Sequence, residues 1–565
     1  MSGLAPRNTD PGAGSLLVRE LGIHPVTAQV LVGRGISTPE AARAFLHPSP
    51  NGLHDPSLLT DLDRAVERIE RALADGATIA VYGDYDVDGV CSTAVMTRIL
   101  EAMGGKVRPY IPHRVTDGYG LNGEALQRLH QEGCGLVVTV DNGITRAQAV
   151  ADAVAAGLDV VITDHHEPDA RIPDCPVVNP KRHDETYPFQ GLAGCGVAFK
   201  LACGLAEGRG PAFAARFKEL LPDLLAIVAV GTIADVVPLL DENRVLVRSG
   251  LAALAGTRHA GLRALLKVAR CEGRKLRASD VGFRIGPRIN AAGRLGSAQL
   301  ALDLILCEDE EEAQRMAKEL DGCNRERQKI ERKHAEDAYA QAEAMLAAED
   351  LPALVIAGQD WHPGVIGIVA ARVAERFGKP AALIAVDSEV GRGSARSHGD
   401  VRLHEALTAS TEHLVSHGGH ALAAGFTMKP DKIDDFRKAF VEAIRAQSSG
   451  DRAPRIVDAE VPIDQIHRSL AAEIALLQPF GCDNREPIFC ARGVRVAGKP
   501  RRVGADGQHL VFFAAGERTS WRAVAFKQFE RAPLLRGPVD LAFTLRQKDD
   551  TDGVELHVRE IHAAE

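Results

Sequence analysis

The 565-residue sequence has no run of about 18 uncharged apolar residues, the length needed to cross a bilayer as a helix. Its most apolar stretch, residues 220–240, is interrupted by Asp223 and Asp235. Residues 1–16 contain Pro and Gly but lack the apolar core of a secretory signal. We therefore expect no membrane segment and no export signal.

Paired cysteines and an excess of positive charge are also missing. The ten cysteines show no Cys-x-x-Cys pair and no regular spacing, which argues against a disulfide framework or a structural zinc site and favours reduced thiols in the cytoplasm. The net charge is −9, but nucleic-acid binding depends on local patches and is not excluded. With 45% hydrophobic and 25% charged residues, the chain has the composition of a globular protein.

Short apolar runs alternate with helical patterns from residue 61 onwards. The runs cover residues 78–83, 106–111, 136–140 and 159–163, with helical segments such as 124–130 and 146–156 between them. This alternation predicts an α/β domain with a parallel sheet.

The length indicates about three or four domains, and changes in the pattern suggest where they lie. Residues 303–350 contain one Gly and no Pro, which predicts a long connecting helix. Short alternating strands near 509–513, 521–526 and 554–561 predict a small β-barrel or sandwich. The predicted order is a loose arm and helical lead-in (1–60), an α/β domain with a basic C-terminal segment (61–302), the helix (303–350), a second α/β domain (351–446), a polar linker, and the β-domain (456–565).

Three aspartates follow the first predicted strand at alternate positions: Asp84, Asp86 and Asp88. Carboxylates on one side of an extended chain repel one another, so a cation is their natural partner. The spacing also matches the start of an EF-hand loop, but the twelfth loop position is Val95 instead of Glu and the preceding segment is a predicted strand. We therefore reject the calcium loop. A polar turn that caps a helix explains one such Asp but not three.

Two further strands end in similar chemistry. Residues 137–140 lead into Asp141, and residues 160–163 lead into Asp164, His165 and His166. Sites in open parallel sheets lie at the carboxyl ends of the strands, so we expect these side chains to meet, with Asp235 as a further candidate. Carboxylates with imidazole suit Mn²⁺ or Mg²⁺, and two such ions about 3.5–4 Å apart would activate water for phosphoryl displacement.

At the Asp-His-His sequence the chain resembles the DHH phosphoesterase superfamily and, within it, the RecJ exonucleases specific for single-stranded DNA. The resemblance extends from about residue 16 to residue 561 and rests on nine strings in the family's order. These are YGDYDVDGVCS, VTVDNGIT, TDHHEP, GTIADVVPL, IGPRINAAGRLG, CNRERQ, DWHPGVIGIVA, SHGGHALAAGF and QPFG. One departure lies after Gly481, where the family's Gly-Asn-Pro-Glu-Pro is replaced by residues 482–487, CDNREP.

The resemblance implies a two-metal site and the fold that carries it. Asp86 and Asp141 would hold one ion, and Asp88, His165 and Asp235 the other, with Asp141 bridging both. The implied fold is a DHH catalytic α/β domain, a long helix, a DHH-associated α/β domain and an OB-fold.

Three more residues receive roles around those metals. Asp84 would be a ligand or lie behind the ligands. Asp164 would orient His165, since a metal-bound imidazole usually has a partner on its other nitrogen. His166 would face the scissile phosphate.

A basic segment between residues 244 and 294 suggests a path for DNA. It contains twelve Lys or Arg against only Glu272 and Asp280, a net charge of +10. A solvated face would explain about half of them, whereas a phosphate-tracking groove favours Arg284, Arg288 and Arg294, which lie among glycines. The resemblance adds phosphate contacts by Ser394, Arg396 and His420, and a contact of Arg114 with the 5′ end.

The resemblance therefore predicts a metal-dependent exonuclease that degrades single-stranded DNA from its 5′ end to nucleotides, in repair and recombination. A DHH phosphatase for small substrates is the first alternative, but it would need neither the basic segment nor the β-domain. A degenerate DHH replication scaffold is the second, but such scaffolds have lost ligands that are all present here. The sequence does not decide the preferred metal, the oligomeric state, whether the barrel binds DNA or a partner, or whether a single-strand binding protein or a helicase is that partner.

Overall fold

A five-stranded parallel sheet forms the first α/β unit. The computed structural model describes residues 4–112, 120–447, 455–504, 506–547 and 553–564. The sheet order is β3-β2-β4-β5-β6, with β3 (Lys106–Tyr110), β2 (Thr78–Tyr82), β4 (Cys134–Val140), β5 (Asp159–Thr163) and β6 (Val177–Val178). The four predicted strands are confirmed. The two-residue β6 is too short to leave a signal in the sequence.

Helices cover both faces of this sheet because alternate strand residues point to opposite sides. Ile79 and Val81 of β2 enter a core with α5 (Val87–Ala102), α8 (Gly194–Ala206) and α9 (Gly210–Ala234), whereas Ala80 and Tyr82 face α6 (Gly123–Gln131) and α7 (Ala147–Ala155). The remaining helices of the unit are α4 (Leu62–Ala74), α10 (Asp241–Ala255), α11 (Ala260–Val268), α12 (Ala278–Asp280), a π-helical turn (Val281–Ile285), α13 (Gly286–Leu295) and α14 (Gln299–Leu306).

The second α/β unit contains a mixed sheet of order β10-β11-β9-β8-β7. Its strands are β7 (Leu354–Gln359), β8 (Ala381–Val386), β9 (Gly391–Arg396), β10 (Ser416–Gly419) and β11 (Ala423–Met428). Only β7 and β8 are parallel. The helix α16 (Ile366–Phe377) packs on one face, and α17 (Leu403–Ala409) and α18 (Ile433–Gln447) pack on the other.

The C-terminal strands close into a barrel, which decides between the two predicted β-architectures. The closed order is β14-β15-β16-β18-β17 with β17 returning to β14. The strands are β14 (Phe489–Val503), β15 (His509–Ala515), β16 (Ser520–Ala525), β17 (Val539–Gln547) and β18 (Val554–Ala563). A five-stranded closed barrel of this kind is the OB architecture. The short β12 (Arg455–Val457) and β13 (Ala459–Glu460) and the helix α19 (Arg468–Leu476) precede it.

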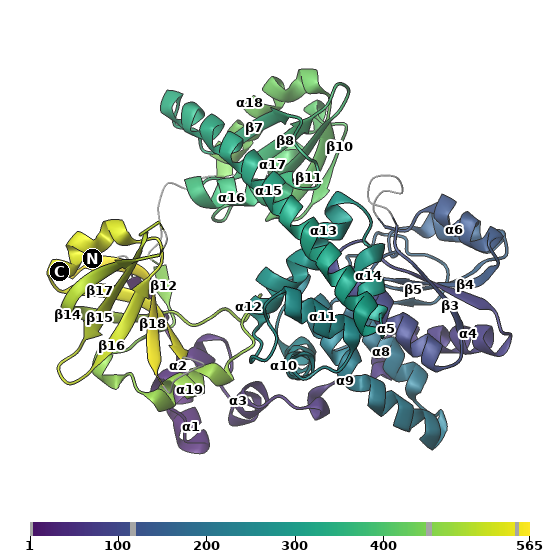
Figure 1. The fold of residues 1–565 in the computed structure, drawn as a ribbon, viewed down its shortest axis with the longest axis horizontal. Helices are drawn as coiled ribbons and strands as arrows, with labels where there is room; N and C mark the ends of the chain where they lie inside the picture. The colour runs from purple at the N-terminus through teal and green to yellow at the C-terminus, as the bar shows by residue number, and fades with distance from the viewer. Residues whose placement is uncertain (1–3, 113–119, 448–454, 505, 548–552, 565) are drawn as a thin grey trace.

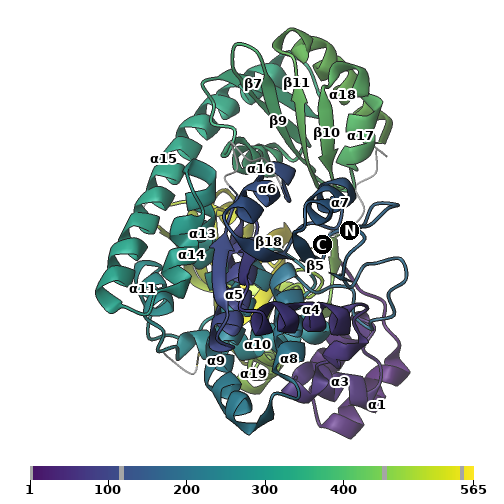
Figure 2. The ribbon, with the colours of Figure 1, turned by 90° about the vertical axis from the view of Figure 1, so that its right-hand side faces the viewer.

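The long helix is real, but its predicted start is wrong. Residues 299–306 form the separate helix α14, and α15 (Glu310–Ala348) begins only after Asp309, whose carboxylate accepts the Glu312 N–H at 2.8 Å. This cap ends the continuity that the Pro-free sequence suggested. The early half of α15 packs on the first unit and the late half on the second, so that α15 runs up one side of the molecule between them (Figures 1 and 2).

The N-terminal residues form three helices, so the predicted helical lead-in is present and the loose arm predicted before it is wrong. These are α1 (Pro11–Leu21), α2 (Pro25–Gly33) and α3 (Pro39–Leu46), and each begins with a capping side chain followed by Pro. That pairing is a helix-start signal readable in the sequence. The three helices share one core with the barrel and α19, and β1 (Leu4–Pro6) pairs with β12. The two ends of the chain therefore fold as one unit (Figure 1).

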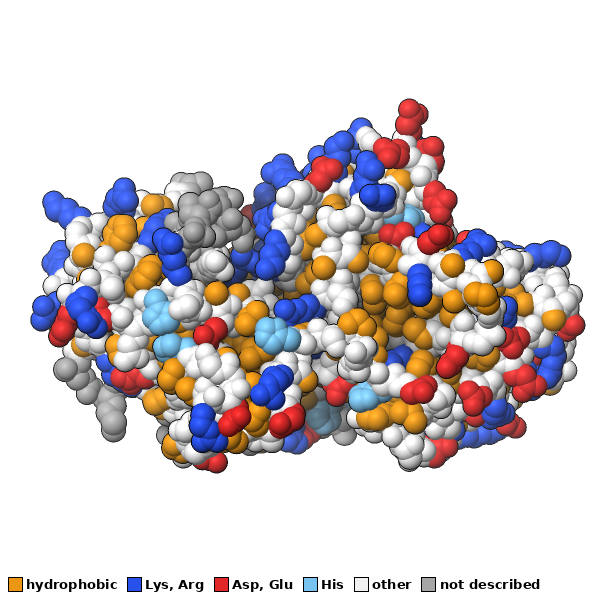
Figure 3. Space-filling view, turned by 90° about the horizontal axis from the view of Figure 1, so that it is seen from below, with side chains coloured by type: hydrophobic (Ala, Val, Ile, Leu, Met, Phe, Trp, Pro, Cys, Tyr) orange, Lys and Arg blue, Asp and Glu red, His pale blue; other side chains and the backbone are white. Residues whose placement is uncertain are grey.

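In Figure 1 this unit lies to the left of the first α/β unit, and the second α/β unit lies above both. The view from below shows charged side chains of both signs spread over the surface with apolar ones between them (Figure 3). Within the described ranges, no helix combines the length and the apolar character that a membrane span requires.

Candidate metal centre

The aspartates after β2 occupy the turn that starts α5. Asp86 caps this helix by accepting the Gly89 N–H at 3.0 Å, which explains why α5 begins at Val87. Asp84 accepts the N–H of Tyr85 at 2.6 Å. Asp84 and Asp88 are buried, so their carboxylates point inward rather than into solvent.

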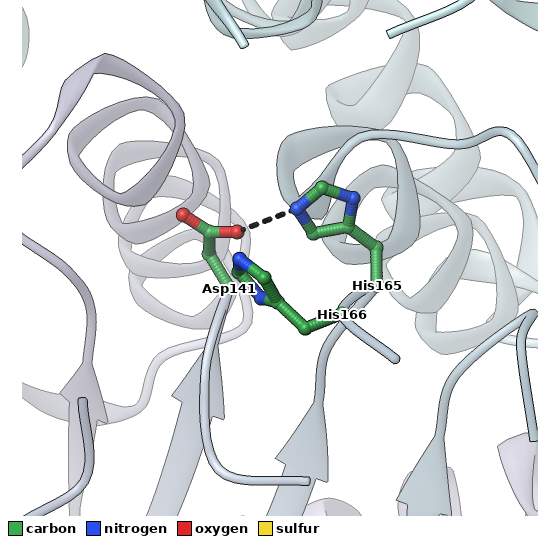
Figure 4. Close-up of side chains that lie close together, drawn as sticks. All are labelled: Asp141, His165 and His166. Carbon is green, nitrogen blue, oxygen red and sulfur yellow. Dashed lines mark ion pairs between the residues drawn. The ribbon is translucent and has the colours of Figure 1, made fainter. Parts of the chain in front are cut away.

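Asp141 and His165 meet at the carboxyl ends of β4 and β5. Asp141 has φ 64°, a left-handed conformation that Asp tolerates better than most residues. The Nε2 atom of His165 lies 3.1 Å from Asp141 Oδ1 (Figure 4). The same nitrogen lies 3.6 Å from Asp235 Oδ2 and 3.9 Å from Asp88 Oδ2. The predicted convergence of three strand ends is therefore present, with Asp235 supplied by the end of α9.

Asp164 has a different partner from the one we predicted. Its Oδ1 atom lies 2.7 Å from Nδ1 of His166 and accepts the backbone N–H of His165, while Oδ2 accepts the Ile144 N–H. The imidazole oriented by Asp164 is thus that of His166. Burial alone would raise the pKa of Asp164, but the His166 hydrogen bond and the neighbouring imidazoles hold it below its usual value.

The electrostatics of the cluster favour a bound cation. Burial, together with the charges of neighbouring carboxylates, raises the pKa of Asp84 to about 7 and of Asp235 to about 9. Burial and mutual repulsion also raise the pKa of Asp141, and burial raises that of Asp88. Burial lowers the pKa of His165 to about 4, so its imidazole is neutral and has a lone pair for a metal. A divalent ion would relieve this repulsion.

The donor atoms fit such an ion. Among the described residues, two triads place their ligand atoms within 4.8 Å of one another: Asp88, His165 and Asp235, and Asp141, His165 and His166. Asp141 Oδ1 and both ring nitrogens of His165 are buried without a hydrogen-bond donor or acceptor partner among those residues. Oxygen atoms with one imidazole suit Mn²⁺ or Mg²⁺. Asp84 and Asp86 belong to neither triad.

The three arginines favoured as DNA contacts hold parts of the protein together. Arg288 forms an ion pair with Asp321 of α15 at 2.9 Å. Arg284 donates to the carbonyl of Arg270, and Arg294 donates to the carbonyl of Gly364 in the second unit at 2.9 Å. These contacts explain the arginines structurally, and nothing in them points to phosphate.

The other predicted phosphate contacts lie in the second unit. Arg396 of β9 donates to Ser394 Oγ at 3.0 Å, and both side chains face Gly367 in the first turn of α16, where an added Cβ would lie 2.9 Å from each. His420 follows β10 and is exposed. Arg114 lies outside the described residues.

A cleft that was not predicted separates the first α/β unit from the barrel and the N-terminal helices, which together form the barrel unit. Its volume is about 670 Å³. Lys275 and Arg277 line one wall and Arg485 and Arg546 the other, around apolar residues that include Phe480. No sequence signal pairs these segments, because they are about 200 residues apart.

Family models match three parts of the chain. They are the DHH family N-terminal domain at residues 78–232, the DHHA1 domain at 350–446 and the RecJ OB domain at 457–558. The two units and the barrel described above correspond to these three matches.

Curated relatives match over most of the chain. The single-stranded-DNA-specific exonuclease RecJ of Bacillus subtilis (strain 168) is 38% identical over 91% of this chain, which spans 64% of that relative. The protein of the same name from Escherichia coli (strain K12) is 36% identical, with 83% of each chain covered. The crystal structure of RecJ in complex with Mn²⁺ from Thermus thermophilus superposes with a TM-score of 0.83 at 32% identity, over 100% of this chain and 79% of that one.

Proposed function

Because this chain belongs to the family of RecJ single-stranded-DNA-specific exonucleases, we propose that it hydrolyses single-stranded DNA from the 5′ end to nucleotides with the help of Mn²⁺ or Mg²⁺. The observation that carries the proposal is the approach of His165 to Asp88, Asp141 and Asp235 at the carboxyl edge of the sheet. Repair and recombination are the processes it would serve. The cytoplasmic location and a single-strand binding protein or helicase as partner rest on the sequence alone.

The proposed ligands include the whole of the first triad and Asp141 of the second; Asp86 joins them, and His166 does not. Asp88, His165 and Asp235 would hold one ion, and Asp86 and Asp141 the other, with Asp141 shared. Asp84 would lie behind these ligands. Bound ions of this kind polarise a phosphoryl oxygen and lower the pKa of water. The alternative of a small-substrate phosphatase is disfavoured because it would use neither the barrel nor the basic cleft.

His166 has a role of its own in this proposal. Burial lowers its pKa, but the hydrogen bond and charge of Asp164 raise it to about 9. The imidazole is therefore protonated at neutral pH and held on one side by Asp164. Its other ring nitrogen can donate a hydrogen bond to an oxygen of the scissile phosphate, where negative charge increases in the transition state.

Reading of the 5′ end is assigned to Arg396, whose guanidinium is suited to a terminal phosphate. We expect Arg396→Ala to slow digestion of 5′-phosphorylated strands about tenfold and of 5′-hydroxyl strands much less, since one charge-assisted contact contributes about 1.5 kcal/mol. The measurement compares kcat/KM for the two substrates. Arg392→Ala, at an exposed position on the same strand, is the control. Equal slowing of both substrates would contradict the assignment.

The cleft between the catalytic unit and the barrel is the proposed path of the strand beyond the metal centre. Lys275 and Arg485 are exposed on its opposite walls. We expect Lys275→Ala combined with Arg485→Ala to weaken single-strand affinity and to reduce the slope of log K against log salt by roughly one to two units. The charge-matched control is Arg315→Ala with Lys329→Ala on α15, where both side chains are exposed. An unchanged slope would exclude this path.

A further inference from the structure

Two carboxylates of the metal centre, and the backbone of a third aspartate, each lie against a glycine from a neighbouring helix turn. An ideal Cβ on Gly194, the first residue of α8, would lie 2.5 Å from Asp141 Oδ1. A Cβ on Gly231 of α9 would lie 2.5 Å from Cys195 Sγ and 2.8 Å from Asp88 Oδ1, and one on Gly89 of α5 would lie 2.5 Å from the Asp84 backbone. These separations are shorter than real Cβ contacts allow. At Gly194 a carboxylate therefore occupies the space that another residue would fill, and at Gly231 a carboxylate and a thiol share it.

The backbone conformation does not require glycine at these positions. None of the three has a φ in the left-handed region, and each lies in an ordinary helical turn. Alanine is the better helix former in such a setting, especially inside α9. Glycine is therefore needed at these positions because it has no side chain, and not because of its conformational freedom.

Asp88 is also fixed by hydrogen bonds from the same helix start. Its Oδ2 accepts the Gly194 N–H at 2.6 Å, and its Oδ1 accepts the Cys195 N–H at 3.0 Å. The residue before α8, Ala193, has no side chain that can cap the helix, so Asp88 performs this task from a distant part of the chain. The positive end of α8 also favours the ionised carboxylate.

From these contacts we propose that Gly194 and Gly231 are positioning residues, which set the separation and direction of the Asp88 and Asp141 carboxylates and thereby the affinity for the divalent ions. The proposal rests on the proposed metal-dependent function. Gly194 acts on both ligands, since its N–H holds Asp88 while its bare Cα leaves room for Asp141. Gly89 abuts backbone atoms, so its replacement would move the chain itself and is a poorer probe.

The test is Mn²⁺ binding by isothermal titration calorimetry on the full chain without DNA. We expect Gly194→Ala and Gly231→Ala each to raise the dissociation constant of at least one of the two Mn²⁺ ions tenfold or more. The metal-free unfolding temperature of Gly194→Ala should stay within about 2 °C, because its added methyl meets only the Asp141 side chain. Gly231→Ala should lower that temperature more, because its methyl also meets the buried Cys195 thiol. The control is Gly322→Ala on α15, where a Cβ would meet nothing within 4 Å. This variant should bind Mn²⁺ as the wild type does.

A double-substitution cycle separates positioning from general damage. If the Gly194 methyl acts through Asp141, adding Gly194→Ala to Asp141→Ala should change the remaining Mn²⁺ affinity by less than twofold. Wild-type Mn²⁺ affinity in both glycine variants would overturn the proposal, and so would loss of the folded state, which would assign the glycines to packing. Absence of Mn²⁺ binding to the wild-type chain would instead overturn the metal-dependent function on which the proposal rests.

Discussion

Asp141→Ala is expected to lower kcat on single-stranded DNA by at least about a thousandfold, equivalent to about 4 kcal/mol. In the proposed site this carboxylate serves both ions, and it lies 3.1 Å from Nε2 of His165. Its removal therefore takes a ligand from both proposed ions at once. DNA affinity should change far less, because the basic cleft is not altered and the substitution removes a negative charge from the catalytic edge.

The measurement is single-turnover digestion of an end-labelled strand across a Mn²⁺ series, with strand affinity measured in parallel. Chelation of the wild-type protein should reproduce the loss. Asp169→Ala is the matched control, since this exposed carboxylate follows the neighbouring strand β5 but belongs to neither triad. Turnover within tenfold of wild type by Asp141→Ala would be incompatible with a shared ligand.

Much of this centre could be predicted from local sequence because each part lies at the end of a strand. Asp141 and His165 follow apolar runs that can only be buried strands, and the carboxyl ends of parallel strands share one edge. The partner of Asp164 could not be read in the same way. His165 and His166 are adjacent in sequence, and only the side-chain rotamers decide which imidazole meets the carboxylate.

The separate units of the fold could also be predicted from local sequence patterns, whereas the contacts between the units could not. Hydrophobic periodicity predicts the strands of the barrel, but it does not indicate that α1, α2 and α3 pack on that barrel across some 450 residues of chain. The cap that separates α14 from α15 is a single Asp in a charged stretch. Such a stretch is compatible with either a continuous or an interrupted helix.

Arg244 illustrates how a count of basic residues misleads. It is one of the twelve cations counted above in the basic segment, which we expected either in a solvated face or in a DNA groove, yet its side chain is buried. Its guanidinium donates to the carbonyls of Phe45, Leu476 and Leu477 at 2.8–2.9 Å and lies 3.9 Å from the centre of the Phe45 ring. Burial lowers its pKa below the usual value for arginine. Arg244 therefore ties α10 of the catalytic unit to the end of α3 and to the segment after α19.

Arg244→Met is accordingly expected to destabilise the junction between the catalytic and barrel units by about 2–4 kcal/mol, because three carbonyls lose the hydrogen bond from the guanidinium while the side-chain volume is nearly kept. Urea unfolding should show a lower midpoint or a separate early transition, and limited proteolysis should cut between residues 46 and 60 or between 477 and 488. Arg258→Met, at an exposed position of the same basic segment, should leave both readouts unchanged.

If Arg244→Met unfolds as the wild type does but loses strand affinity in a salt-dependent way, the residue is a DNA contact after all. If stability falls and the salt slope stays the same, Arg244 is a clamp that holds the barrel beside the catalytic unit.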